Sequence, residues 1–113
     1  MQHDDLVYVR HMLDMAELAT QKVAGKSRAS YDADEILRLA LAHLVQTIGE
    51  AAARVSPDFR LRHPTIPWSR VIGMRHRIVH DYLDVNYSIL WDVLIVDLPT
   101  LIEDLRDIAG SAG

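Results

Sequence analysis

The chain has 113 residues, half hydrophobic and a quarter charged, which is typical of one globular domain spanning residues 1–113. The absence of cysteine excludes disulfides, thiolate metal sites and cysteine nucleophiles, and the net charge of −4 argues against nonspecific coating of nucleic acid. No apolar run approaches the roughly 20 residues that span a bilayer, and the first residues lack a signal-peptide pattern, so we expect a cytoplasmic protein without membrane contact.

Helical periodicity dominates the first half of the chain. Apolar residues spaced by three and four predict a helix from about Asp4 or Asp5 to Ala24, followed by Gly25. The stripe expected to be buried comprises Leu6, Val9, Leu13, Ala16, Thr20 and Val23. A second helix is predicted to begin near Asp32, because Asp32 and Glu35 have the spacing of a capping box, and to end before Pro57. Its predicted core residues are Leu37, Leu41, Leu44, Ile48, Ala51 and Val55.

The second half of the chain predicts two further helices. Residues 56–66 contain two prolines and are expected to form a loop. Pro67 suits the first turn of a helix that continues to about Leu83. Asn86 is a suitable cap for a last helix reaching about Ala109, with a kink or break at Pro99 and an end to the ordered structure at Gly110. No segment alternates with a period of two, so we expect no sheet and an all-α, up-and-down bundle of four or five helices.

Charge is distributed unevenly along the chain. Residues 54–80 have a net charge of +5, between an N-terminal part of −3 and a C-terminal part of −6. The one acid of this stretch is Asp58. Its positive charges are all arginines: Arg54, Arg60, Arg62, Arg70, Arg75 and Arg77. Arginine suits bidentate phosphate contacts better than lysine does. The stretch is therefore either an anion-binding patch or a solvated, arginine-rich loop.

Arg75 interrupts the apolar face of the predicted third helix. On a helical wheel it lies between Tyr82 and Val79, within the apolar arc. Because burying an unpaired guanidinium is costly, we expect Arg75 to face either an interior carboxylate, such as Glu50, or a cleft that binds an anion. His80 lies about 140° further round an ideal helix. A site that uses both residues therefore requires the helix to end or distort before His80, or requires a second protomer.

Two histidines and a tyrosine of this helix can be explained without a functional role. His76 and His80 are one helical turn apart, a spacing that metal ligands use, but no third ligand accompanies them in a motif, and we expect neither a metal nor a cofactor. Tyr82 shares the face of Arg75, and a tyrosine there is consistent with an amphipathic residue at the edge of an interface.

The segment from Arg75 to Tyr82 has the pattern R-x4-H-x-Y. Together with Ile48-Gly49-Glu50, Ile66-Pro67-Trp68 and Asp84-Val85-Asn86, this pattern resembles the HepT-like ribonuclease toxins of the HEPN superfamily, which are paired with a minimal nucleotidyltransferase antitoxin, MntA. The resemblance covers the whole chain. It implies a HEPN-like helical bundle that forms a homodimer, with the motif lining a cleft between the protomers.

The resemblance also implies an activity and its control. We expect a metal-independent endoribonuclease toxin of a type VII toxin–antitoxin system, with Arg75 and His80 as catalytic residues and Arg60 and Arg62 as candidates for guiding RNA. Transfer of AMP from the antitoxin to Tyr82 would neutralise it. The alternatives are a non-catalytic helical partner or modification substrate of a nucleotidyltransferase, and a bundle with a purely structural dimer interface.

Overall fold

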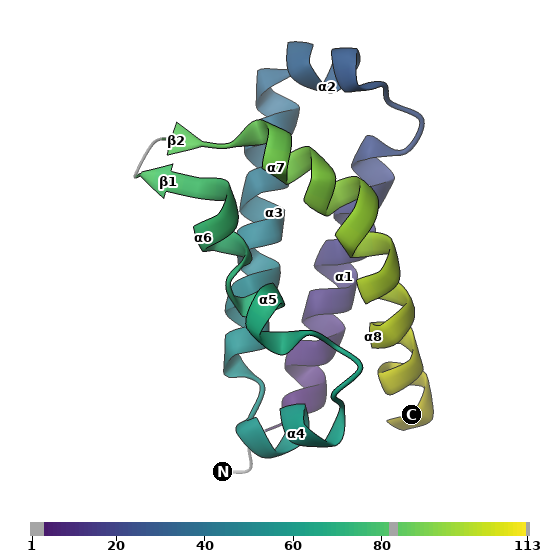
Figure 1. Cartoon of the computed structure of the whole chain (residues 1–113). Helices are drawn as coiled ribbons and strands as arrows, with labels where there is room; N and C mark the ends of the chain where they lie inside the picture. Colours follow the sequence, from purple (N-terminus) through teal and green to yellow (C-terminus); the bar gives the residue numbers. More distant parts are fainter. Residues whose placement is uncertain (1–3, 82–83, 113) are drawn as a thin grey trace.

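Three long helices form the body of the molecule in the computed structural model, which describes residues 4–81 and 84–112, with the backbone alone for residues 80, 81, 111 and 112. Helix α1 (Asp5–Val23) packs lengthwise against α3 (Glu35–Arg54) and α8 (Leu98–Ala112), as Figure 1 shows. Their contact encloses one apolar core, whose fully buried side chains include Val9, Met12, Leu41, Val45, Ile48, Leu98 and Leu105. Burial of each such side chain contributes roughly 1.5–3 kcal/mol to folding, so this contact is what holds the bundle together.

The first helix is confirmed at both ends. The side chain of Asp4 caps α1 by accepting a hydrogen bond from the backbone N–H of Leu6 at 3.1 Å. Beyond the last turn, Gly25 has a φ of 74°, a conformation that glycine adopts without steric cost. The buried face is shifted slightly from the predicted stripe, since Met12 and Ala19 are buried.

The second predicted helix is preceded by a short one, α2 (Arg28–Ala33). Asp34 separates α2 from α3 and caps α3, because its carboxylate accepts a hydrogen bond from the Leu37 N–H at 3.0 Å. The predicted start near Asp32 is therefore wrong. Asp32 instead lies within α2, where its carboxylate is 3.0 Å from the Nε of Arg28.

The loop predicted over residues 56–66 contains another short helix, α4 (Pro57–Arg62). A proline that ends one helix can also occupy the first turn of the next, and Pro57 does both. Ser56 caps α4 through the Phe59 N–H, and its hydroxyl donates to the carboxylate of Asp5 at 2.7 Å. This bond ties the start of α4 to the start of α1.

The helix predicted to run to about Leu83 is broken and much shorter. It consists of α5 (Trp68–Ile72) and α6 (Met74–Ile78), and the chain then enters a two-stranded antiparallel sheet formed by β1 (Val79–Asp81) and β2 (Asp84–Val85). Val79 faces Val85 in the register, and Asp81 faces Asp84 across an irregularity. The expectation of no sheet is therefore wrong. Strands this short are not long enough to show an alternating sequence pattern, and their pairing depends on a contact between residues that are not adjacent in sequence, so local periodicity could not predict them.

The last predicted helix is divided where a break was expected. Asn86 caps α7 (Tyr87–Asp92), and a π-helical turn, η1 (Val93–Asp97), leads into α8. Pro99 cannot donate the backbone hydrogen bond of an α-helix, and its ring would clash with a carbonyl one turn earlier, so the change of helix type at this point is expected. Gly110 lies inside α8, so the predicted end of ordered structure there is wrong. With these breaks, the described residues form more helical segments than the four or five expected.

Helix α3 is long and apolar enough to cross a membrane by length and composition alone, which the sequence analysis did not expect. Within the fold, Leu41, Val45 and Ile48 of α3 are buried in the core, as in the central helix of a bundle.

Candidate functional site

Arg75 lies on the outer face of the short helix α6. Gly73 separates α6 from α5, and the break changes the phase of the apolar pattern, so that Met74 and Ile78 are buried while Arg75 and His76 are exposed. The prediction that Arg75 lies inside an apolar face is therefore wrong. The helical wheel assumed one continuous helix, and a single break rotates every residue after it.

The partner of Arg75 is an amide. Its Nε donates a hydrogen bond to Oε1 of Gln46 on α3 at 3.2 Å. Among the side chains that the structure describes, Arg75 forms no ion pair, so the proposed pairing with Glu50 is not found. A guanidinium carries several N–H donors in a rigid fork, and one bond to Gln46 orients it while leaving the other donors able to bind an anion.

His80 is carried by strand β1, because helix α6 ends at Ile78. Val79 already has extended dihedral angles, φ −112° and ψ 111°, and the Asn86 N–H donates to the Ile78 carbonyl. The requirement that the helix end before His80 is thus met. The side chain of His80 and the whole of Tyr82 lie outside the part of the chain that the structure describes.

Two glycines set the position of the segment that carries Arg75. A Cβ at Gly49 on α3 would lie 3.1 Å from the carbonyl oxygen of Val71 and 3.3 Å from that of Ile72. Only a residue without a side chain allows the end of α5 to approach α3 this closely. At Gly73 a Cβ would lie 3.1 Å from the Ser69 carbonyl oxygen, so the break between α5 and α6 also depends on glycine.

Asp97 forms ion pairs with both helices that flank the break at Gly73, a role that the sequence did not predict. Its carboxylate lies 3.3 Å from Nη2 of Arg70 on α5 and 3.0 Å from Nη1 of Arg77 on α6. Asp97 is the last residue of the π-helical turn η1. The one signal in the sequence is that an acid interrupts the apolar run from Val93 to Leu98.

The remaining arginines of the basic stretch lie near α4. Nε of Arg60 donates to the Val55 carbonyl oxygen at 3.0 Å, and the guanidinium of Arg62 lies 5.6 Å from the centre of the Phe59 ring. Neither contact neutralises the positive charge. The stretch therefore keeps a positive surface at α4, whereas Asp97 partly neutralises Arg70 and Arg77.

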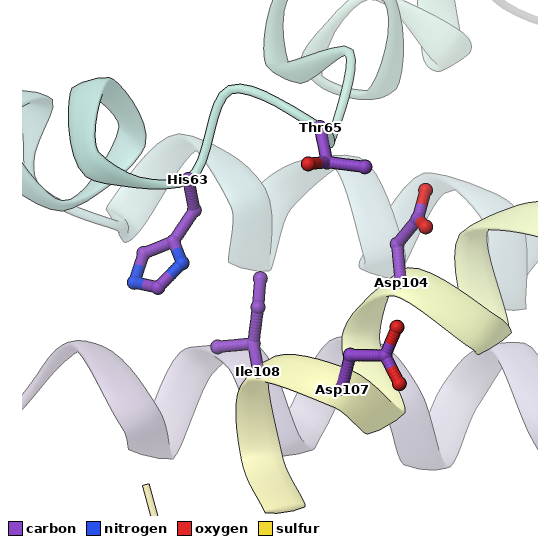
Figure 2. Close-up of a pocket in the computed structure, with 5 residues that line it drawn as sticks. All are labelled: His63, Thr65, Asp104, Asp107 and Ile108. Carbon is purple, nitrogen blue, oxygen red and sulfur yellow. The ribbon is translucent and has the colours of Figure 1, made fainter. Parts of the chain in front are cut away.

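A polar hollow between α8 and the connection from α4 to α5 is acidic, in contrast to the positive surface at α4 (Figure 2). Its volume is about 210 Å³, and it is lined by His63, Thr65, Asp104, Asp107 and Ile108. The carboxylates of Asp104 and Asp107 would repel phosphate, so this hollow is a poor site for nucleic acid. No group of three or more His, Asp or Glu side chains that could hold a metal ion occurs among the described residues.

Comparison with known proteins points to one family. The model of the ribonuclease HepT-like family matches residues 12–108. A protein of Caldanaerobacter subterraneus subsp. tengcongensis named "Putative RNase" is 32% identical over 101 residues, which cover 89% of this chain and 90% of the relative. A "Probable ribonuclease HepT" of Thermococcus cleftensis is 28% identical over 98 residues, covering 87% of this chain and 86% of the relative. No solved structure matches the chain.

The match extends from α1 to α8 and includes the whole segment from Arg75 to Tyr82. Relatives of similar length align over most of their sequence, so the similarity is not confined to one motif. The resemblance seen in R-x4-H-x-Y and its flanking residues is thereby confirmed, and the chain belongs to the ribonuclease HepT-like family.

Proposed function

We propose that this protein is a metal-independent endoribonuclease that acts as the toxin of a type VII toxin–antitoxin system. Family membership supports the activity, and one structural observation supports the site: α6 ends at Ile78, so Arg75 and His80 are not held on divergent faces of one helix. Arg75 is exposed and oriented by a neutral partner, Gln46, which leaves its charge available to a phosphate.

In the proposed reaction, the neutral imidazole of His80 removes the proton from a ribose 2′-hydroxyl. The 2′-oxygen attacks the adjacent phosphorus, and the bond from phosphorus to the 5′-oxygen breaks. Arg75 stabilises the negative charge that develops on the phosphoryl oxygens. The products are a 2′,3′-cyclic phosphate and a 5′-hydroxyl, and the leaving 5′-oxygen takes a proton from the imidazolium form of His80 in the second protomer, which becomes neutral. Acid or base catalysis of this kind supplies about 10²–10⁴-fold for each group.

We place this chemistry in a cleft between two copies of the chain. The exposed face of α6 allows Arg75 to contribute to such a cleft, and His80 follows on β1, the strand that comes directly after α6. A homodimer would supply the second imidazole that the leaving group requires.

The proposed control is covalent. A minimal nucleotidyltransferase antitoxin of the MntA type would transfer AMP from ATP to the hydroxyl of Tyr82, forming a phosphodiester and releasing pyrophosphate. The added phosphate is negative and bulky, and it would compete with the substrate phosphate for the guanidinium of Arg75. Mass spectrometry of the protein co-expressed with its antitoxin tests this step. An unmodified Tyr82 in a fully neutralised complex contradicts it.

The experiment that tests the activity compares RNA with DNA of the same sequence. The purified protein is expected to cut RNA in the presence of a chelator, to leave 2′,3′-cyclic phosphate ends, and to spare DNA, which lacks the attacking hydroxyl. His80→Ala is expected to lower the rate by at least about 10²-fold with the circular dichroism spectrum unchanged. Cleavage by His80→Ala at the wild-type rate removes His80 from the mechanism. Growth inhibition without RNA cleavage favours a non-catalytic partner of the nucleotidyltransferase.

A further inference from the structure

An open groove lies between α4 and the start of α5. It has a volume of about 640 Å³ and is lined by α4 and by residues 64–70. Its apolar surface includes Pro57, Leu61, Pro64 and Trp68, and Leu61 is 79% exposed. Figure 1 shows α4 at the bottom of the molecule, with α5, α6 and β1 following in turn along the same flank.

The charge of this groove is positive, unlike that of the molecule as a whole. Among the described residues that line it, Arg60 and Arg70 are charged and none is acidic. The bond from Arg60 to the Val55 carbonyl holds its guanidinium at the groove without neutralising it. The side chain of Arg70 is 56% exposed even though it is paired with Asp97, and Asp97 shares its charge with Arg77.

We propose that this groove binds an unpaired stretch of the RNA substrate beside the cleavage site, an inference that rests on the proposed function. Arg60 and Arg70 contact phosphates, and the flat faces of unstacked bases lie on Leu61 and the prolines. Proteins that bind single-stranded RNA combine these two kinds of surface, cations for the backbone and apolar or aromatic groups for base faces. Paired bases keep their faces stacked, so the apolar surface selects single-stranded over double-stranded RNA.

The groove lies beside the segment that leads to the catalytic residues. Arg70, at one side of the groove, belongs to α5, and Arg75 belongs to α6, which follows directly after Gly73. A strand whose phosphates contact Arg60 and Arg70 is thereby directed along α5 toward α6. An acidic peptide would complement the same charges, but the groove lies on the segment that leads to Arg75, and this position and the family's ribonuclease character favour RNA.

The test measures equilibrium binding of uncleavable RNA, so it does not depend on catalysis. Wild-type protein is titrated with fluorescent, unstructured 2′-O-methyl oligonucleotides of increasing length and with a duplex, over a range of salt concentrations. The expected results are tighter binding as single strands lengthen and little gain for the duplex. Arg60→Gln and Arg70→Gln are each expected to reduce the slope of log K against log salt by about 0.7.

Substitutions at Leu61 distinguish the apolar contact from general charge. Leu61→Asn removes the apolar surface without changing the charge and is expected to weaken binding of the long single strand by about tenfold with the salt dependence unchanged, whereas Leu61→Lys is expected to steepen the salt dependence. Arg10→Gln makes the same charge change as Arg70→Gln, but on the exposed surface of α1 outside the groove, and serves as the matched control. Circular dichroism verifies that each variant is folded.

The outcomes separate this inference from the proposed function. If the groove variants bind like wild type, or no more weakly than Arg10→Gln, the groove inference is wrong, whether or not the protein cleaves RNA. If groove-dependent binding is found but wild-type protein cleaves no RNA, the inference stands as single-stranded RNA binding and the proposed function fails. Displacement of long RNA by poly-glutamate at lower concentrations than by unlabelled RNA would assign the groove to an acidic peptide instead.

Discussion

At the scale of single residues, the arginines of α6 differ in what an incoming phosphate would have to displace. Arg77 is half-buried and lies 3.0 Å from the carboxylate of Asp97, so a phosphate must compete with a negative charge to reach it. Arg75 is exposed, and its hydrogen bond goes to the neutral amide of Gln46. Arg75 is therefore the arginine of this helix better suited to bind a reacting phosphate.

Substitution of Arg75 is expected to impair catalysis without affecting the fold. Arg75→Gln removes the charge and should lower kcat/KM by about 10²–10³-fold. Arg75→Lys should recover only part of that loss, because an ammonium restores the charge but lacks the planar fork of a guanidinium. The free energy of unfolding should change by less than about 0.5 kcal/mol, since the side chain is exposed. Single-turnover RNA cleavage and urea denaturation measure the two effects. Wild-type activity in Arg75→Gln would exclude the assigned role.

Tyr31 links stability to alkaline pH. Burial raises the pKa of Tyr31 to about 12, and its hydroxyl donates to the Tyr87 carbonyl oxygen at 2.7 Å, joining α2 to α7. Because the folded pKa lies above the unfolded value of about 10, this residue's contribution is fully present below about pH 10 and is lost as the pH rises toward 12.

The Tyr31→Phe variant isolates that contribution. It should be less stable than wild type by about 0.5–1.5 kcal/mol at neutral pH, and the difference should shrink as the pH rises above about 10. Urea denaturation of both proteins at a series of pH values provides the measurement. A difference that stays constant up to about pH 11.5 would show that Tyr31 does not titrate in this way.

At the scale of elements, close backbone packing between α3 and α5 sets the position of α6, the helix in which the R-x4-H-x-Y motif begins. α5 approaches α3 so closely at Gly49 that a single added methyl group would meet two carbonyl oxygens. Backbone cannot move aside as a flexible side chain can. The position of α5, and through Gly73 that of α6, is therefore coupled to one residue of the central helix.

Two glycine-to-alanine substitutions are expected to have opposite effects. Gly49→Ala should destabilise the protein by about 1–3 kcal/mol, because the new Cβ overpacks the contact with α5. Gly110→Ala, at an exposed position in α8 where a Cβ meets nothing within 4 Å, should stabilise it by about 0.5–1 kcal/mol. Thermal and urea denaturation measure both. A neutral effect of Gly49→Ala would mean that α5 can shift freely.

The cap of α3 can be tested with a neighbouring acid as the control. Asp34→Ala removes the bond to the Leu37 N–H and should cost about 1 kcal/mol. Asp32→Ala removes only an exposed ion pair with Arg28, which is worth less than about 1 kcal/mol and weakens with salt. Denaturation at low and high salt distinguishes the two losses. A larger cost at Asp32 than at Asp34 would restore the start that the sequence predicted.

At the scale of the whole molecule, the arginines of α4, α5 and α6 form a basic flank on an otherwise acidic chain. Such an arrangement attracts a polyanion to one side and repels it from the rest. In the proposed dimer, both basic flanks lie around one cleft, and each copy contributes its own Arg75 and His80 to the same substrate.

Mixing inactive variants with each other and with wild type tests that dimer. His80→Ala chains are unfolded and refolded together with an equal amount of inactive Arg75→Gln chains or of wild-type chains, which should form mixed dimers in about half of the molecules. If cleavage uses the His80 of both protomers, the mixture of the two inactive variants stays inactive, and the mixture with wild type cleaves RNA at about a quarter of the rate of the same total amount of wild type. Light scattering verifies the dimer. A mixture with wild type that retains about half of the rate would confine each site to one chain.

The sequence by itself determined the helical class, the extent of α1, the cap at Asn86, the break near Pro99 and the family, because these depend on local spacing, capping chemistry and residue identity. It predicted Arg75 as a site residue, but on a buried face. Only the tertiary structure decided the break at Gly73, the hairpin that carries His80 and the pairing of Asp97 with Arg70 and Arg77. These features depend on contacts between segments distant in the chain, whose energies outweigh the local preference for one continuous helix.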